Sequence, residues 1–170
     1  GLLSANSANN AGSGQFSIEG WTKITGNRNW SRIFDFGSSD TTGTGVGGEI
    51  TGPGGSGNGL DYVFYSAQVG GDVNVHQLVV RNMEPNPGGD IVTDVIPGVF
   101  NADLHFVMTW EESTGLVKIY ENGKEAAAIL TPDEMSDIND INVWLGRSNW
   151  TGDQNMQGEF DEVRIYDHVL

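Results

Sequence analysis

Residues 158–170 read GEFDEVRIYDHVL, and they decide the fold class because they form the clearest β-strand pattern in the chain. Alternation along a strand places Val163 and Ile165 on one face. Asp161 shares that face, so we expect it to point toward the core where the strand begins. An unpaired buried carboxylate is costly, which predicts that Asp161 has a cation or backbone N–H groups beside it.

The rest of the chain indicates one all-β domain over residues 1–170. Its 170 residues are enough for a single sizeable core, and they include 25 glycines and five tryptophans. Roughly ten short alternating segments separated by turns favour a two-sheet antiparallel sandwich. We expect strands at 15–23, 31–36, 60–66, 75–82, 91–95, 104–111, 116–121, 124–130, 141–146 and from 158 onward.

Three other segments are expected to lack strands. Residues 1–14 are small and polar and predict a loop. The glycine-rich segment 43–59 predicts no regular structure. Residues 131–140 are acidic and begin with Thr-Pro, which is typical of one helical turn.

Charge and composition exclude several classes of function. A net charge of -15 with only eight Lys and Arg argues against nucleic-acid and anionic-membrane partners. No apolar run is long enough for membrane insertion. The absence of cysteine excludes a disulfide scaffold, a thiolate zinc site and a cysteine nucleophile. The composition fits a secreted protein.

Three ordered motifs together resemble a known family. They are FSIEGW (16–21) followed by IFDFG (33–37), HFVMTW (105–110) running to IYENG (119–123), and LGR (145–147) followed by GEFDEVRIY (158–166). This order is similar to the laminin G-like (LamG-like) jellyroll domains of the concanavalin A-like lectin/glucanase superfamily. The resemblance implies a two-sheet jellyroll excised from a larger protein, with an N-terminal strand missing. It does not fix function, because this fold hosts lectins, adhesion modules, glucanases and spacers.

The resemblance also implies a calcium site. In calcium-bearing relatives the aspartate that begins the last strand binds the ion together with backbone carbonyls. Mapped by motif, this implies Asp161 with the carbonyls of Gly37 or Ser38, and calcium as the cofactor; calcium prefers such oxygen ligands. The alternative is that Asp161 caps backbone N–H groups without a metal.

Two similar loop sequences are candidates for carbohydrate binding. Sugars require an aromatic platform beside amide or carboxylate groups. RNWS (28–31) and SNWT (148–151) each supply an indole, and acidic and amide residues follow the second. The alternative is that both indoles pack against neighbouring strands. The predicted ligand-binding residues are Trp30, Asn149, Trp150 and Asp153.

No catalytic constellation is found. The closest approach to a paired-carboxylate site is EFDEVR (159–164), where Arg164 stands in place of the third acid. We therefore expect a non-catalytic recognition module, extracellular, at the cell surface or periplasmic, that binds a glycan or a protein surface. The alternatives are a polysaccharide hydrolase or lyase on the same fold, and a ligand-free structural spacer. The oligomeric state is left open.

Overall fold

The computed structural model describes residues 1–50, 57–82 and 90–170, and it consists of two β-sheets. One sheet contains β1 (Gln15–Ile24), β8 (Asp103–Glu111), β9 (Leu116–Glu121), β10 (Lys124–Leu130) and β12 (Gly158–Tyr166). The other contains β2 (Arg32–Asp40), β3 (Gly47–Gly48), β4 (Asn58–Ser66), β5 (Val75–Arg81), β6 (Ile91–Val92), β7 (Ile96–Pro97) and β11 (Asn142–Leu145). None of the described helices is long and apolar enough to cross a bilayer.

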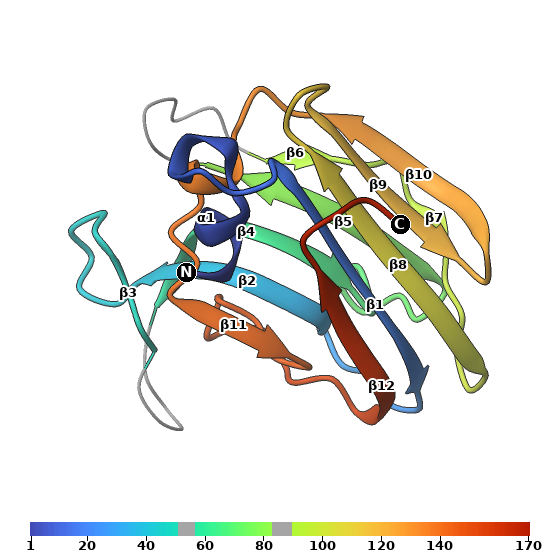
Figure 1. The fold of residues 1–170 in the computed structure, drawn as a ribbon. Helices are drawn as coiled ribbons and strands as arrows, with labels where there is room; N and C mark the ends of the chain where they lie inside the picture. Colours follow the sequence, from blue (N-terminus) through green and yellow to red (C-terminus); the bar gives the residue numbers. More distant parts are fainter. Residues whose placement is uncertain (51–56, 83–89) are drawn as a thin grey trace.

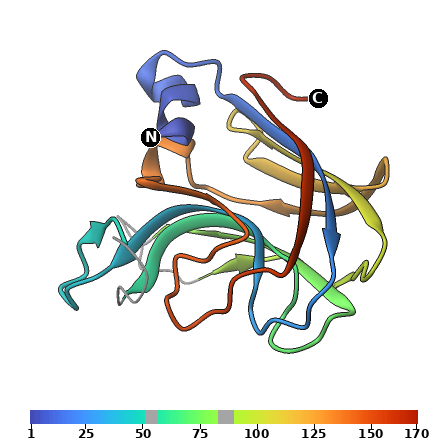
Figure 2. The same cartoon turned by 90° about the horizontal axis from the view of Figure 1, so that it is seen from below.

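The two sheets pack face to face as layers (Figure 1, Figure 2). The five-stranded sheet has the order β10-β9-β8-β1-β12. The seven-stranded sheet has the order β11-β2-β4-β5-β6, with β3 beside β2 and β7 beside β5. All strand pairings are antiparallel in the described part of the chain. The predicted all-β two-sheet jellyroll is confirmed.

One core fills the space between the sheets. Strand alternation sends Phe106, Met108 and Trp110 of β8 inward, and all three are fully buried. Phe34 of β2 meets Phe106 across the layers, with ring centroids 6.0 Å apart. Burying each large apolar side chain stabilises the fold by about 1.5–3 kcal/mol, so this aromatic contact helps to fix how the sheets sit on each other.

Two expectations outside the strands were wrong. Residues 1–14 are not all loop, because α1 (Leu2–Asn6) and the 3-10 helix η1 (Ala8–Asn10) form there. Leu3 is fully buried in the core, and its N–H donates to Asp140 Oδ2 at 2.8 Å. Burial of the Leu3 side chain stabilises this short helix. The polar composition of residues 1–14 gave no indication of the helix. In the glycine-rich segment, β3 and the start of β4 are present, while residues 51–56 lie outside the described residues.

The predicted core-facing orientation of Asp161 is wrong, because β12 contains a β-bulge. Glu162 has a φ of 50°, and the pairing with β1 shifts register between Glu19 and Trp21. The extra residue reverses the alternation, as bulges do. Phe160 and Val163 pack against the core, and Asp161 is exposed on the outer face beside Trp21.

Two of the edge strands, β11 and β12, leave apolar side chains partly uncovered. Val143 and Leu145 of β11 are each 43% exposed, and Ile165 of β12 is 42% exposed. Val143 and Leu145 pair with the buried residues Phe36 and Phe34, and Ile165 pairs with the buried Ile18. They therefore face the core side of their sheets. That an upstream strand is missing stays a prediction.

Candidate functional site

Two loops lie against each other on the outer face of the seven-stranded sheet. The first joins β1 to β2 and carries Trp30, and the second joins β11 to β12 and carries Trp150 and Asp153. The N–H of Gln154 donates to the Asn29 carbonyl at 3.1 Å, and the N–H of Asn29 donates to Gln154 Oε1 at 2.8 Å. These hydrogen bonds bring the two Asn-Trp sequences together although they are far apart in the chain.

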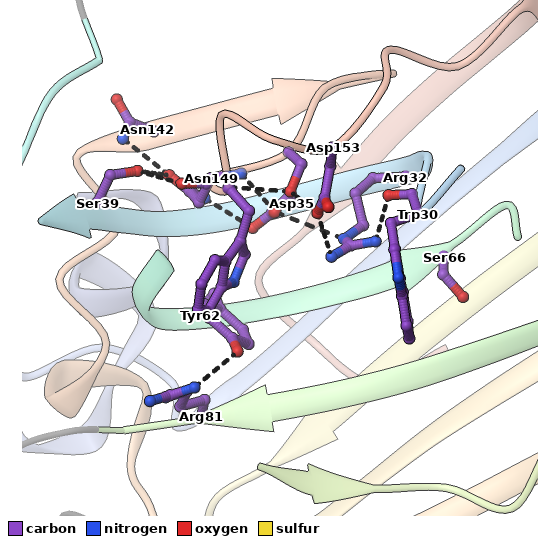
Figure 3. A network of polar contacts seen from close by, with 12 residues as sticks. Trp30, Arg32, Asp35, Ser39, Tyr62, Ser66, Arg81, Asn142, Asn149 and Asp153 are labelled. Carbon is purple, nitrogen blue, oxygen red and sulfur yellow. Dashed lines mark hydrogen bonds and ion pairs between the residues drawn. The ribbon is translucent and has the colours of Figure 1, made fainter. Parts of the chain in front are cut away.

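Arg32, the first residue of β2, lies beneath both loops (Figure 3). Its side chain is only 3% exposed. Nη2 donates to Asp153 Oδ2 at 2.9 Å, and Nη1 donates to the Trp30 carbonyl. The guanidinium carbon lies 3.8 Å from the centroid of the Phe64 ring, which is a cation–π contact. One buried arginine therefore ties the tryptophan loops to the aromatic surface of the sheet.

A buried hydrogen-bond network anchors the second loop from below (Figure 3). Asp35 of β2 accepts hydrogen bonds from the backbone N–H of Asn149 at 2.8 Å and from its Nδ2 at 2.7 Å. Asn149 Oδ1 accepts from Asn142 Nδ2 at 2.8 Å and from Ser39 Oγ at 3.2 Å. The prediction that Asn149 contacts a ligand is wrong, because its side chain is fully buried and engaged in holding the loop.

The buried carboxyl of Asp35 predicts a pH dependence of stability. Burial raises the pKa of Asp35 from 3.8 to about 6, against the opposing effects of Arg32 and Asn149. A group with a raised folded pKa stabilises the fold fully below its unfolded value, and this contribution is lost as the pH rises through the folded value. Between about pH 3 and pH 7, the unfolding free energy of the wild type relative to Asp35→Asn should fall by about 3 kcal/mol. Urea titrations at several pH values measure this difference, and parallel pH profiles for the two proteins would contradict it.

Trp30 is held in an unfavourable backbone conformation. Its φ of 52° lies in the left-handed region, which costs a non-glycine residue about 1–2 kcal/mol. Two contacts impose this conformation, since the Trp30 N–H donates to the Gly70 carbonyl at 2.8 Å and the Trp30 carbonyl accepts from Arg32. Backbone strain of this kind concentrates at ligand-binding sites.

The two indoles line a pocket of about 250 Å³. Trp150 packs against a cluster on the outer face of β4 and β5, formed by Tyr62, Phe64 and Val79. Asp153 supplies a polar group, and burial raises its pKa above the usual range. Its Oδ2 accepts from Arg32 and from Ser148 Oγ, whereas Oδ1 has no hydrogen-bond partner among the described residues. The lining residues are Trp30, Arg32, Tyr62, Phe64, Asp90, Trp150 and Asp153.

A second polar group closes the rim of the pocket. The hydroxyl of Tyr62 donates to Asp90 Oδ1 at 2.8 Å, and Arg81 Nη1 lies 3.3 Å from that hydroxyl. Burial raises the pKa of Tyr62 well above its usual value, so the hydroxyl remains a hydrogen-bond donor. Arg32, Tyr62 and Asp90 were not predicted from the sequence. The alternation in β4 could have indicated Tyr62, because it places Tyr62 and Phe64 together on the outer face of the sheet.

The predicted metal ligands are not brought together, and their grouping is wrong. Gly37 and Ser38 are buried in β2 of the seven-stranded sheet, whereas Asp161 lies on the outer face of the other sheet. Within residues 1–50, 57–82 and 90–170, no group of three or more His, Asp or Glu side chains is placed to hold a metal ion. These residues therefore do not fit calcium, and calcium binding elsewhere stays a prediction.

Asp161 instead lines a hollow of about 420 Å³ on the outer face of the five-stranded sheet. Trp21 is the indole there, and its ring lies 4.7 Å from that of His105. The carboxylates of Asp103, Glu159 and Asp161 share this hollow. Among the described residues, no buried arginine and no pair of hydrogen-bonded loops supports this hollow. The pocket on the opposite sheet has both, and we therefore take it as the candidate site.

The fold and the pocket together define a β-sandwich domain with an aromatic pocket on the outer face of one sheet. A family model, Laminin_G_3, described as the concanavalin A-like lectin/glucanases superfamily, matches residues 2–170. The chain belongs to this superfamily, as its three motifs predicted. No curated protein matches the sequence.

Solved structures share the fold at low sequence identity. The CBM40 domain of the Ruminococcus gnavus IT-sialidase superimposes with a TM-score of 0.69 at 15% identity, over 99% of this chain and 80% of that one. Domain 4 of AbnA, an extracellular GH43 arabinanase from Geobacillus stearothermophilus in complex with arabinotriose, gives 0.60 at 19% identity, over 90% and 60%. A leech intramolecular trans-sialidase gives 0.69 at 15% identity, over 99% of this chain and 22% of that enzyme.

Proposed function

We propose that this domain is a non-catalytic carbohydrate-binding module whose site is the pocket of Trp30, Tyr62 and Trp150. The observation that carries the proposal is the combination of aromatic walls with the open acceptor Asp153 Oδ1. Sugar rings present C–H faces that pack on aromatic rings, and hydroxyl edges that donate hydrogen bonds. Arg32 and the Asp35–Asn149 contacts hold these groups in place before a ligand arrives, which lowers the entropic cost of binding.

Similar structures support a glycan ligand. The R. gnavus CBM40 domain has been solved with α2,3 sialyllactose and with α2,6 sialyllactose, and AbnA domain 4 with arabinotriose. Those ligands belong to those proteins, and the shared fold supports only the general class of partner. The arabinanase is described as extracellular, which is consistent with the extracellular or cell-surface location that we propose here.

A glycan array probed with the purified domain tests the proposal, followed by calorimetry with the glycans that bind. We expect saturable binding, with glycan chains that remain intact after prolonged incubation. Shortened chains would instead favour the hydrolase or lyase reading. A blank array would favour a structural spacer and overturn the proposal.

Gly59, in β4, leaves the space that Trp150 occupies. A Cβ at this position would lie 2.4 Å from Trp150 Nε1 and 2.7 Å from Tyr62 Cε1. We expect Gly59→Ala to displace the indole and to weaken glycan binding about tenfold, a loss of about 1.4 kcal/mol. Calorimetry measures the change. Gly152→Ala is the matched control in the same loop as Trp150, because its Cβ would meet nothing within 4 Å. Equal affinities for the two variants would contradict the expectation.

A further inference from the structure

The charges around the pocket restrict the kind of sugar that fits it. Among the described residues that line the pocket there are one cation, Arg32, and two carboxylates, Asp90 and Asp153. The buried carboxyl of Asp35 lies beneath them, with its Oδ2 3.8 Å from Arg32 Nε. The whole chain carries a net charge of -15. A negatively charged ligand would therefore enter a negative field, which lowers its rate of association and its affinity.

Arg32 does not offer a free cation to such a ligand. Both terminal nitrogens already donate, to Asp153 and to the Trp30 carbonyl, and Phe64 covers one face of the guanidinium. The third nitrogen, Nε, has no hydrogen-bond partner in the described part of the chain, but it is buried and lies 3.8 Å from Asp35 Oδ2. A sugar carboxylate would have to displace Asp153, which would also lose its hydrogen bond from Ser148. Removing one partner from a buried ion pair is strongly unfavourable.

The second cation near the pocket is also engaged. Arg81 Nη1 lies 3.3 Å from the Tyr62 hydroxyl and 3.4 Å from Asp90 Oδ1. The Tyr62 hydroxyl itself donates to Asp90. Arg81 thus compensates the Asp90 carboxylate at the rim, and it adds no net positive charge to this pair.

Asp153 Oδ1 has no hydrogen-bond partner among the described residues, and as an acceptor it requires a donor from the ligand. Sugar hydroxyls are such donors, whereas a carboxylate accepts hydrogen bonds and cannot supply one. We propose that the pocket selects uncharged glycans and discriminates against sialylated or uronic-acid glycans. This inference rests on the proposed function. It runs against the sialyllactose ligands of the R. gnavus domain with the same fold.

Matched pairs of glycans test the selectivity. The array should contain lactose beside α2,3 sialyllactose, and neutral oligosaccharides, arabinotriose among them, beside uronic-acid oligosaccharides. We expect each acidic glycan to bind at least about tenfold more weakly than its neutral counterpart. Added salt should leave the affinity for neutral glycans unchanged. It should reduce the difference in affinity between neutral and acidic glycans, because salt screens the electrostatic repulsion.

The outcomes separate this inference from the proposed function. Acidic glycans that bind as tightly as their neutral counterparts, and more weakly with added salt, would overturn the selectivity and leave the carbohydrate-binding proposal standing. No binding to any glycan would overturn both.

Two variants test the cause of the selectivity. Asp153→Asn removes the carboxylate paired with Arg32, and Asp90→Asn removes the more exposed carboxylate at the rim. Each should raise the ratio of acidic to neutral affinity by about fivefold or more, because each removes one repulsive charge. If Asp153→Asn lowers stability too far, Asp90→Asn still gives an answer. A ratio that changes in neither variant would contradict the electrostatic explanation.

Discussion

Replacing Trp150 by alanine should reduce glycan affinity about thirtyfold, which corresponds to about 2 kcal/mol. The Trp150 ring lines the pocket and packs on Tyr62, Phe64 and Val79. Truncation therefore removes both the surface that stacks on the sugar and a wall that excludes water from its hydroxyl contacts. Aromatic anchors in packed, desolvated positions dominate binding energies for this reason.

Calorimetry with a neutral oligosaccharide identified on the array measures this loss. Trp21→Ala is the matched control, because Trp21 is 46% exposed on the other sheet and is separate from the pocket. The Trp21→Ala variant should bind the oligosaccharide with the same affinity as the wild type. If Trp150→Ala bound as tightly as the wild type, or if Trp21→Ala carried the loss, the site would be misassigned.

Replacing Arg32 by alanine should lower the unfolding free energy by about 3–5 kcal/mol, the cost of removing one partner from a buried ion pair. The substitution leaves Asp35 and Asp153 without their cation, and Asp35 is fully buried. It also removes the cover of Phe64 and the donor that fixes the Trp30 carbonyl. Urea titration monitored by tryptophan fluorescence measures the change.

Arg164→Ala is the control for this loss. Arg164 pairs with Glu19 and Glu162, but its side chain is 55% exposed. An exposed pair contributes about 0–1 kcal/mol, so this variant should remain close to the wild type. A loss below about 1 kcal/mol for Arg32→Ala would show that its network does not hold the loops.

Much of the fold was predictable because its strands carry strong local signals. Alternation and turn residues located each long strand to within a few positions, and motif order indicated the jellyroll. Two features were hidden for physical reasons. The N-terminal helix depends on burial of Leu3 against distant parts of the chain. The orientation of Asp161 depends on a bulge at Glu162, which alternation cannot reveal.

The candidate site was predictable only in part. The indoles Trp30 and Trp150 and the carboxylate Asp153 were singled out from their residue types, and the structure brings all three into one pocket. Arg32 and Tyr62 were missed, because their roles arise from strands that become neighbours only after folding. Asn149 has a polar side chain in a loop sequence, but it is buried as a structural anchor.

The most direct test of the central claim is a nuclear magnetic resonance titration that follows the five tryptophan indole N–H signals. The titrant is a neutral oligosaccharide that binds on the array, and single Trp→Phe variants assign the signals. We expect saturable shifts at Trp30 and Trp150, with those of Trp21 and of the buried Trp110 unchanged. Shifts centred on Trp21, with Trp30 and Trp150 unmoved at saturation, would contradict the assignment of this pocket as the carbohydrate site.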